Sequence, residues 1–250
     1  MLIVSRPDGW LAVTQAAHAA MAGVFADAWE EDRFPAPDRA ADLRLAIREH
    51  ELGWAEWDQR PELDPATGLP FTPVSLDPAV HLPMQLEGPR ELARTNVYAG
   101  LLASLKHAGM YERPKPTALI RRRHRLVRSY LRKAAEMNAE LRRRVSVAGA
   151  EIERDRKLVR IWDGLSHDLL LDRAPCVRGP VPTAGEDVFH LQLVPTVRGV
   201  EMSPWPFTGS RLRVEVQGRL LRDTFTDEHA MRVALDQASA VTVGYDLWPA

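Results

Sequence analysis

Residues 173–187, RAPCVRGPVPTAGED, divide the chain into two parts with different hydrophobic patterns. Prolines and glycines at this density interrupt helices and central strands. Before this stretch, apolar residues recur at helical spacing. After it, FHLQLVPT at 189–196 and RLRVEVQG at 211–218 alternate with the period of two that is typical of strands. We therefore interpret residues 173–187 as a linker between a helical part and a small β-rich part.

Working outward from this linker, we predict three units. LIVS and WLAVT flank the turn Arg6-Pro7-Asp8-Gly9 and predict a short β-hairpin over residues 1–14. Residues 15–172 are expected to form a helical domain, in which Asp38 caps a helix that runs through His50 to about Trp57. Residues 185–250 are expected to form a small β-rich α+β appendage. The predicted fold class is mainly α: a helical bundle with an N-terminal hairpin and a C-terminal appendage.

The composition of the 250 residues is that of an ordinary globular protein, with 45% hydrophobic and 27% charged residues. The single cysteine, Cys176, excludes a disulfide framework and fits a reducing compartment. The absence of a long apolar run or a signal-peptide pattern leads us to expect a cytoplasmic protein without a membrane segment. The net charge of −1 hides a basic stretch, since residues 113–144 carry twelve Lys or Arg against two Glu.

Four residues place a histidine or an acid on helix faces that are otherwise apolar: His18, His50, Glu51 and Asp163. At a spacing of three or four residues, His18 shares a side with Met21 and Phe25, and Asp163 shares one with Val159. A carboxylate on such a face is costly unless a partner holds its charge. A shared metal ion explains several such faces at once.

Two further histidines, His81 and His107, extend this series. Small residues share the helix side of His107 and would leave space beside its imidazole. Mixed His–carboxylate ligation suits one or two ions of Fe, Mn or Zn, and Glu51 in the middle of the series would be the bridging ligand of a pair. Such a site can activate a water molecule for hydrolysis, or bind dioxygen when it holds iron.

His50-Glu51-Leu52-Gly53, with His18 upstream and Asp163 in IWDGLS downstream, resembles the HD-domain superfamily over residues 14–170. The resemblance implies a helical, metal-binding fold with a first His, an adjacent His-Asp and a distal Asp as ligands. His81 and His107 resemble the additional ligands of its six-ligand members, which include dinuclear phosphodiesterases and mixed-valent di-iron oxygenases. The sequence differs from the usual motif at two positions: Glu51 stands where Asp is usual, and Trp54 stands where many HD hydrolases have Lys.

The whole chain also resembles an uncharacterised bacterial family of unknown function. The motifs that carry this likeness are TQxxHA at 14–19, HExGW at 50–54, WDxxPxLDPxTGxP at 57–70, SLKH at 104–107, WDGLS at 162–166 and PWPF at 204–207. This second resemblance implies no activity.

The basic helix expected over residues 118–144 has two interpretations. Its arginines can form a solvated face, or an anion site to which Arg121 and Arg125 contribute. Lys106, beside His107, is a further candidate contact for a substrate anion, and Trp54 is a candidate apolar wall. The near-neutral charge and sparse aromatic residues disfavour nucleic acid as a partner and favour a small anionic substrate. Homo-oligomerisation is left open.

Together these features predict a metal-dependent phosphohydrolase in which a metal-bound hydroxide is the nucleophile and no catalytic residue is assigned beyond the metal ligands. The first alternative is a mixed-valent di-iron oxygenase that acts on a small polar substrate. The second is a non-catalytic module that binds a ligand or a partner on a degenerate HD scaffold.

Overall fold

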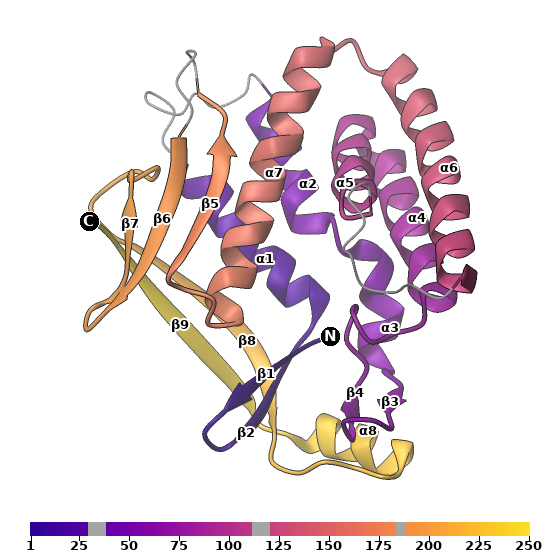
Figure 1. The fold of residues 1–250 in the computed structure, drawn as a ribbon, viewed down its shortest axis with the longest axis vertical. Helices are drawn as coiled ribbons and strands as arrows, with labels where there is room; N and C mark the ends of the chain where they lie inside the picture. The colour runs from indigo at the N-terminus through magenta and orange to yellow at the C-terminus, as the bar shows by residue number, and fades with distance from the viewer. Residues whose placement is uncertain (30–38, 112–120, 184–188) are drawn as a thin grey trace.

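A curled seven-stranded sheet wraps around one side of a group of helices (Figure 1). The computed structural model describes residues 1–29, 39–111, 121–183 and 189–250, and within these ranges it describes no side chain for residues 121–123. The strands of the sheet are β1 (Leu2–Arg6), β2 (Gly9–Val13), β5 (Cys176–Val181), β6 (Phe189–Thr196), β7 (Gly199–Ser203), β8 (Leu212–Leu221) and β9 (Ala240–Pro249).

The order of these strands in the sheet is β1-β2-β8-β9-β7-β6-β5. Neighbouring strands are antiparallel except for the parallel pair β7 and β9. The N-terminal hairpin is paired with β8, in a register that sets Trp10 opposite Leu221. The first and last parts of the chain therefore belong to the same sheet.

The helical layer consists of α1 (Gln15–Ala28), α2 (Ala40–Glu49), the short 3-10 helix η1 (Leu52–Trp54), α3 (Ala55–Gln59), α4 (Pro78–Thr95), α5 (Val97–Gly109), α6 (Arg121–Arg144) and α7 (Gly149–Leu170). The helix α8 (Glu228–Gln237) connects β8 to β9. Side chains of Thr14, Asp77 and Asn96 cap α1, α4 and α5 by accepting hydrogen bonds from the first turn. Within the described ranges, no helix is long and apolar enough to cross a membrane.

Helices and sheet share one hydrophobic core. Inward-facing strand residues such as Leu193 and Val214 belong to the same buried cluster as Phe25 of α1 and Leu165 of α7. α1 contacts β8 and α7 contacts β5, so these two helices lie directly against the sheet. A sheet with one face on the core should alternate buried and exposed residues, and β8 does so along most of its length.

The prediction of a mainly α, HD-like helical bundle is wrong, because the protein is an α+β protein with one large mixed sheet. The N-terminal hairpin does not stand alone, since it extends the sheet from β8. The predicted linker is also partly structured, because Cys176–Val181 form β5. β5 is an edge strand paired with β6, and an edge strand tolerates Pro180 because one of its sides needs no hydrogen-bond donor.

The helix predicted to run through His50 ends earlier, at Glu49. The chain then turns through η1, where Gly53 packs against the backbone of α4. A Cβ atom on Gly53 would lie 2.1 Å from the carbonyl oxygen of Met84, and one on Gly88 would lie 2.5 Å from the nitrogen of Gly53. This close approach requires glycine at both positions and holds η1, which directly follows residues 50 and 51, against α4. The proposed cap Asp38 lies outside the described residues.

The segment after α3 forms a small hairpin of β3 (Leu63–Asp64) and β4 (Leu69–Pro70). The carboxylate of Asp64 accepts a hydrogen bond from the nitrogen of Ala66 and so stabilises the turn. The hairpin contacts the C-terminal part of the chain, because the nitrogen of Leu63 donates to the carboxylate of Glu228 at the start of α8.

Candidate metal centre

Four of the six predicted ligands converge between α1, α2 and α7. His18 lies in α1, His50 and Glu51 follow the last turn of α2, and Asp163 lies in α7. Each residue offers one ligand atom, and these four atoms all lie within 4.8 Å of one another. Two imidazole nitrogens and two carboxylate oxygens form the kind of mixed donor set that first-row transition metals accept. We call these four residues the donor cluster.

Hydrogen bonds on the outer side of the cluster fix the orientation of both imidazole rings. The Nδ1 of His50 is 2.7 Å from the carbonyl oxygen of Ile47, which can only accept, so Nδ1 carries the proton. The Nδ1 of His18 is 3.0 Å from the hydroxyl of Ser166, which itself donates to the carbonyl oxygen of Asp163. Both rings therefore turn Nε2 toward the inside of the cluster.

The Nε2 atoms face negatively charged oxygens at short range. The Nε2 of His18 is 3.1 Å from Oδ1 of Asp163, and the Nε2 of His50 is 3.1 Å from that same oxygen and from Oε1 of Glu51. No hydrogen bond of acceptable geometry satisfies the buried Nε2 of His50. The lone pair of an unprotonated Nε2 and a carboxylate oxygen repel each other at this distance unless a proton or a metal ion lies between them.

Burial and charge set the protonation of the donor cluster, and three of its four members are held in the form that binds a metal. Burial and Lys106 lower the pKa of the fourth member, His50, but Glu51 and Asp163 outweigh them and raise it. Burial, with a smaller contribution from the neighbouring His167, lowers the pKa of His18 from 6.5 to about 4. Burial raises the pKa of Glu51 and of Asp163, but the Lys106 ammonium and the adjacent histidines outweigh this effect, so both pKa values lie well below the usual range. At neutral pH the carboxylates are ionised and His18 is neutral.

Lys106 of α5 lies inside the same cluster. Its Nζ is 2.9 Å from Oε1 of Glu51 and 3.2 Å from Oδ1 of Asp163, and its side chain is 3% exposed. The sequence suggested a lone lysine that contacts an anionic substrate. In the structure, the anions nearest to its ammonium are the two carboxylates of the protein itself.

The two remaining predicted ligands, His81 and His107, point elsewhere. The Nδ1 of His81 is 3.1 Å from the carbonyl oxygen of Leu76, and its Nε2 is 3.0 Å from the hydroxyl of Tyr111. The Nε2 of His107 donates to the carbonyl oxygen of His50 at 2.7 Å. Neither residue belongs to the group of atoms that converge within 4.8 Å. The structure therefore brings four of the potential ligands together in one group, and it does not bring six together around two ions.

The other proposed substrate contacts lie in different surroundings. Trp54 is buried and stacks on His81, with ring centroids 6.3 Å apart, in an apolar cluster that includes Trp57. Arg125 is exposed on α6. The side chain of Arg121 lies outside the described part of the chain.

His167, which was not among the predicted ligands, lies beside the donor cluster. Its ring centroid is 4.1 Å from that of His18, and its Nδ1 donates to the carbonyl oxygen of Asp163 at 3.0 Å. Its side chain is 25% exposed, whereas that of Asp163 is 14% exposed and that of His18 is inaccessible. The i+4 spacing from Asp163 was the available signal, since such residues are neighbours on one helix side.

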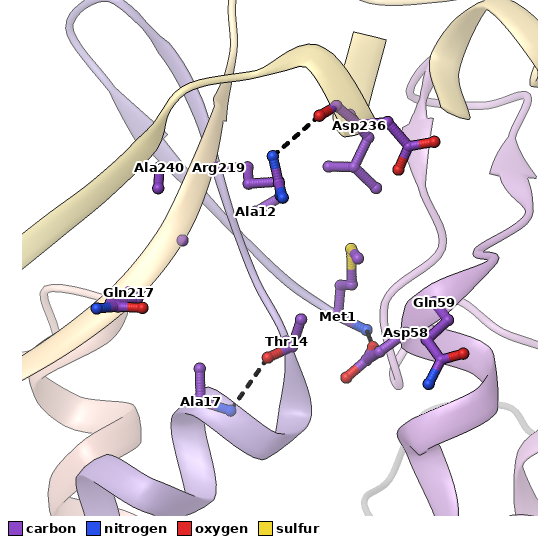
Figure 2. Close-up of a pocket in the computed structure, with 12 residues that line it drawn as sticks. Met1, Ala12, Thr14, Ala17, Asp58, Gln59, Gln217, Arg219, Asp236 and Ala240 are labelled. Atoms are coloured by element: carbon purple, nitrogen blue, oxygen red, sulfur yellow. Dashed lines mark hydrogen bonds and ion pairs between the residues drawn. The ribbon is translucent and has the colours of Figure 1, made fainter. Parts of the chain in front are cut away.

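A separate cavity of about 440 Å³ lies between the start of α1, β8 and the end of α8 (Figure 2). None of the four donor residues lines it. In Figure 2 the amino group of Met1 points toward Asp58, at 2.9 Å, and Arg219 donates to the carbonyl oxygen of Asp236. The carboxylate of Asp58 also accepts a hydrogen bond from the nitrogen of Gln15. The ion pair of Met1 and Asp58 therefore lines the cavity beside the N-terminal end of α1.

Acid should destabilise the fold through His107. Burial lowers the pKa of His107 from 6.5 to about 4, so between these values the unfolded chain binds a proton that the folded chain does not. Stability is therefore lost as the pH falls through this window, by about 2 kcal/mol at pH 5 for this residue. In urea unfolding at pH 5 and pH 7.5, His107→Asn should lose less stability on acidification than the wild type. The exposed His190→Asn should behave as the wild type, and an equal pH dependence in all three proteins would contradict the assignment.

Comparison with known proteins gives a family but no activity. A model of the family described as "Protein of unknown function (DUF3891)" matches residues 1–223. This match confirms the likeness to an uncharacterised family and gives no evidence for an HD-domain segment. No curated protein matches the chain, and no solved structure does.

Proposed function

Since the chain belongs to DUF3891, a family of unknown function, we propose from the site alone that it is a metal-dependent phosphohydrolase. In this proposal His18, His50, Glu51 and Asp163 hold one divalent transition-metal ion, with Mn, Fe and Zn as the candidates. The observation that carries the proposal is the convergence of two inward-turned Nε2 atoms and two ionised carboxylates within 4.8 Å.

The residues fit such an ion by their chemistry. Metal-bound histidines commonly donate their other ring N–H to a backbone carbonyl or a polar side chain, as His50 does to Ile47 and His18 does to Ser166. The unsatisfied Nε2 of His50 is the buried atom that a cation would satisfy. The succession of a first His, an adjacent His-acid pair and a distal Asp also supports an HD-like relation for residues 14–170, which remains part of this proposal.

A divalent cation at this position would supply a Lewis acid that lowers the pKa of a bound water and polarises a phosphoryl oxygen. The protein's own residues would prepare the surroundings. Asp163 and His167 are more exposed than the rest of the site, so substrate and water would approach from their side.

The placement of His81 and His107 supports one ion rather than two. A di-iron oxygenase would need both residues to turn toward a second ion, whereas their ring nitrogens bond to Leu76, Tyr111 and the backbone of His50. The single-ion hydrolase needs no such rearrangement. For this reason we favour hydrolysis over the oxygenase.

The test is metal content together with phosphoester hydrolysis. Protein purified without chelators should contain close to one Mn, Fe or Zn ion per chain and should cleave bis(p-nitrophenyl) phosphate. His50→Ala should lose the metal and lower the hydrolysis rate by at least about 100-fold, because a ligand and its ordering contacts disappear together. The exposed His229→Ala serves as the matched control and should retain both. A wild-type protein that binds none of these metals would contradict the proposal and favour a non-catalytic binding module.

A further inference from the structure

The burial of Lys106 is unusual for a lysine. It lies in α5, where every residue from Tyr98 to Ala108 is buried, so no polar helix face carries it toward solvent. Its side chain is 3% exposed. An ammonium in such surroundings is costly unless strong partners hold it. The packing of α5 therefore buries Lys106, and its ammonium needs negatively charged partners inside the protein.

Those partners are the two carboxylates of the donor cluster. Nζ lies 2.9 Å from Oε1 of Glu51 and 3.2 Å from Oδ1 of Asp163. The Nε2 of His50 lies 3.1 Å from each of the same two oxygen atoms. Lys106 and the metal-facing nitrogen of His50 thus share the same pair of oxygens.

A divalent ion would use these oxygens as well. An ion bound to both at the usual distance of about 2.1 Å would lie within roughly 5 Å of Nζ, if Nζ kept its present contacts. Two positive charges at that range in a buried site repel each other strongly. The ammonium of Lys106 and the metal ion therefore compete for the same two carboxylate oxygens. Binding of the metal must weaken the ion pairs that Lys106 forms with them.

We infer that Lys106 is an internal counter-ion, which holds the two carboxylates when the metal is absent and gives them up when a divalent cation binds. This inference rests on the proposed function, because it takes the donor cluster as a metal site. In this role Lys106 sets the metal affinity of the site, because its positive charge opposes binding of the metal. When no metal is bound, the same charge reduces the repulsion between the two carboxylates.

Lys106→Met tests the inference, because methionine has similar length and no charge. Lys133→Met, at an exposed position of α6, is the matched control. In isothermal titration calorimetry with Mn²⁺ and with Zn²⁺, Lys106→Met should bind at least about tenfold more tightly than the wild type. Without metal its melting temperature should fall by roughly 10 °C, because two buried carboxylates lose their cation. Saturating metal should recover most of this loss, and Lys133→Met should match the wild type throughout.

A second measurement uses the wild-type protein, in case Lys106→Met does not fold. The chain contains four lysines, so the side-chain ammonium signal of Lys106 can be assigned in ¹⁵N-labelled protein by comparison with lysine variants. Addition of one equivalent of Zn²⁺ should shift or broaden this signal. A signal that stays unchanged while the metal binds would overturn the inference.

The outcomes separate this inference from the proposed function. If the wild type binds metal and Lys106→Met gains no affinity, the counter-ion role is wrong and the metal site stands. If only Lys106→Met binds metal, Lys106 holds the carboxylates permanently. The exchange inferred here is then wrong, and so is the proposal that the natural protein works with a metal. If neither protein binds a metal, both ideas are wrong.

Discussion

Asp163→Asn is expected to abolish specific metal binding and phosphoester hydrolysis while the protein remains folded. Oδ1 of Asp163 contacts the Nε2 atoms of His18 and His50 and the ammonium of Lys106. Asparagine keeps the size of the side chain but removes the negative charge that each of these contacts uses. The loss of a direct ligand should lower metal affinity by more than the roughly 10–100-fold that loss of an outer hydrogen-bond partner costs.

Thermal unfolding with and without metal measures this effect directly. An ion present at about 100 times its dissociation constant should stabilise the wild-type protein by about 2.7 kcal/mol. The same concentration should give Asp163→Asn no detectable stabilisation. Asp223→Asn makes the same substitution at an exposed position, and this variant should be stabilised by the metal as much as the wild type. Equal stabilisation of all three proteins would show that the metal binds somewhere other than the donor cluster.

The helical pattern of the sequence predicted much of the site, because three helix faces each carried a charge or an imidazole that needed a partner. His18, His50, Glu51 and Asp163 were found in this way, and the structure brings them together. His81 and His107 were added to this series, His81 through the resemblance to six-ligand HD members, and the structure does not bring them to the other four. A face that points to the interior can meet a backbone carbonyl or a tyrosine as readily as a metal, and helical spacing does not distinguish these partners.

The role of Lys106 was missed for a related reason. A single lysine is usually solvated, and its sequence neighbours did not change that expectation. The informative signal was the composition of the whole segment Val97–Gly109, which carries Lys106 and His107 among apolar and small residues and has no polar side. A helix that is apolar all round is buried, so its lysine must find an anion inside the protein.

The sheet could not be predicted from local patterns, because its pairings join distant parts of the chain. Trp10 lies opposite Leu221, and no short-range signal links the two residues. β5 was hidden for a different reason, since Pro175, Gly179 and Pro180 are typical of a linker. These residues are compatible with an edge strand, whose outer side makes no ladder hydrogen bonds.

Two adjacent residues of β6 allow a test of whether the sheet and the helices fold as one unit. Leu193 is fully buried in the shared core, whereas Val194, on the opposite face, is 47% exposed. Leu193→Asp places an unpaired carboxylate in the core and should cost at least about 4 kcal/mol. Val194→Asp introduces the same side chain one position away, opposite Glu201 on β7, and should cost less than about 1 kcal/mol.

The shared core predicts how Leu193→Asp should unfold. Because the inner face of the sheet packs on α1 and α7, the helices should lose their structure together with the sheet, in a single transition at lower urea concentration than in the wild type. Far-ultraviolet circular dichroism reports the helices, and fluorescence of Trp205 and Trp248 reports the C-terminal part of the chain when the other tryptophans are replaced by phenylalanine. Two separate transitions, with the helices intact after the sheet has melted, would show that residues 15–172 form an independent domain. Coincident transitions would show that the helices carrying the donor cluster depend on the sheet for their stability, although no residue of the sheet contributes a ligand atom to the cluster.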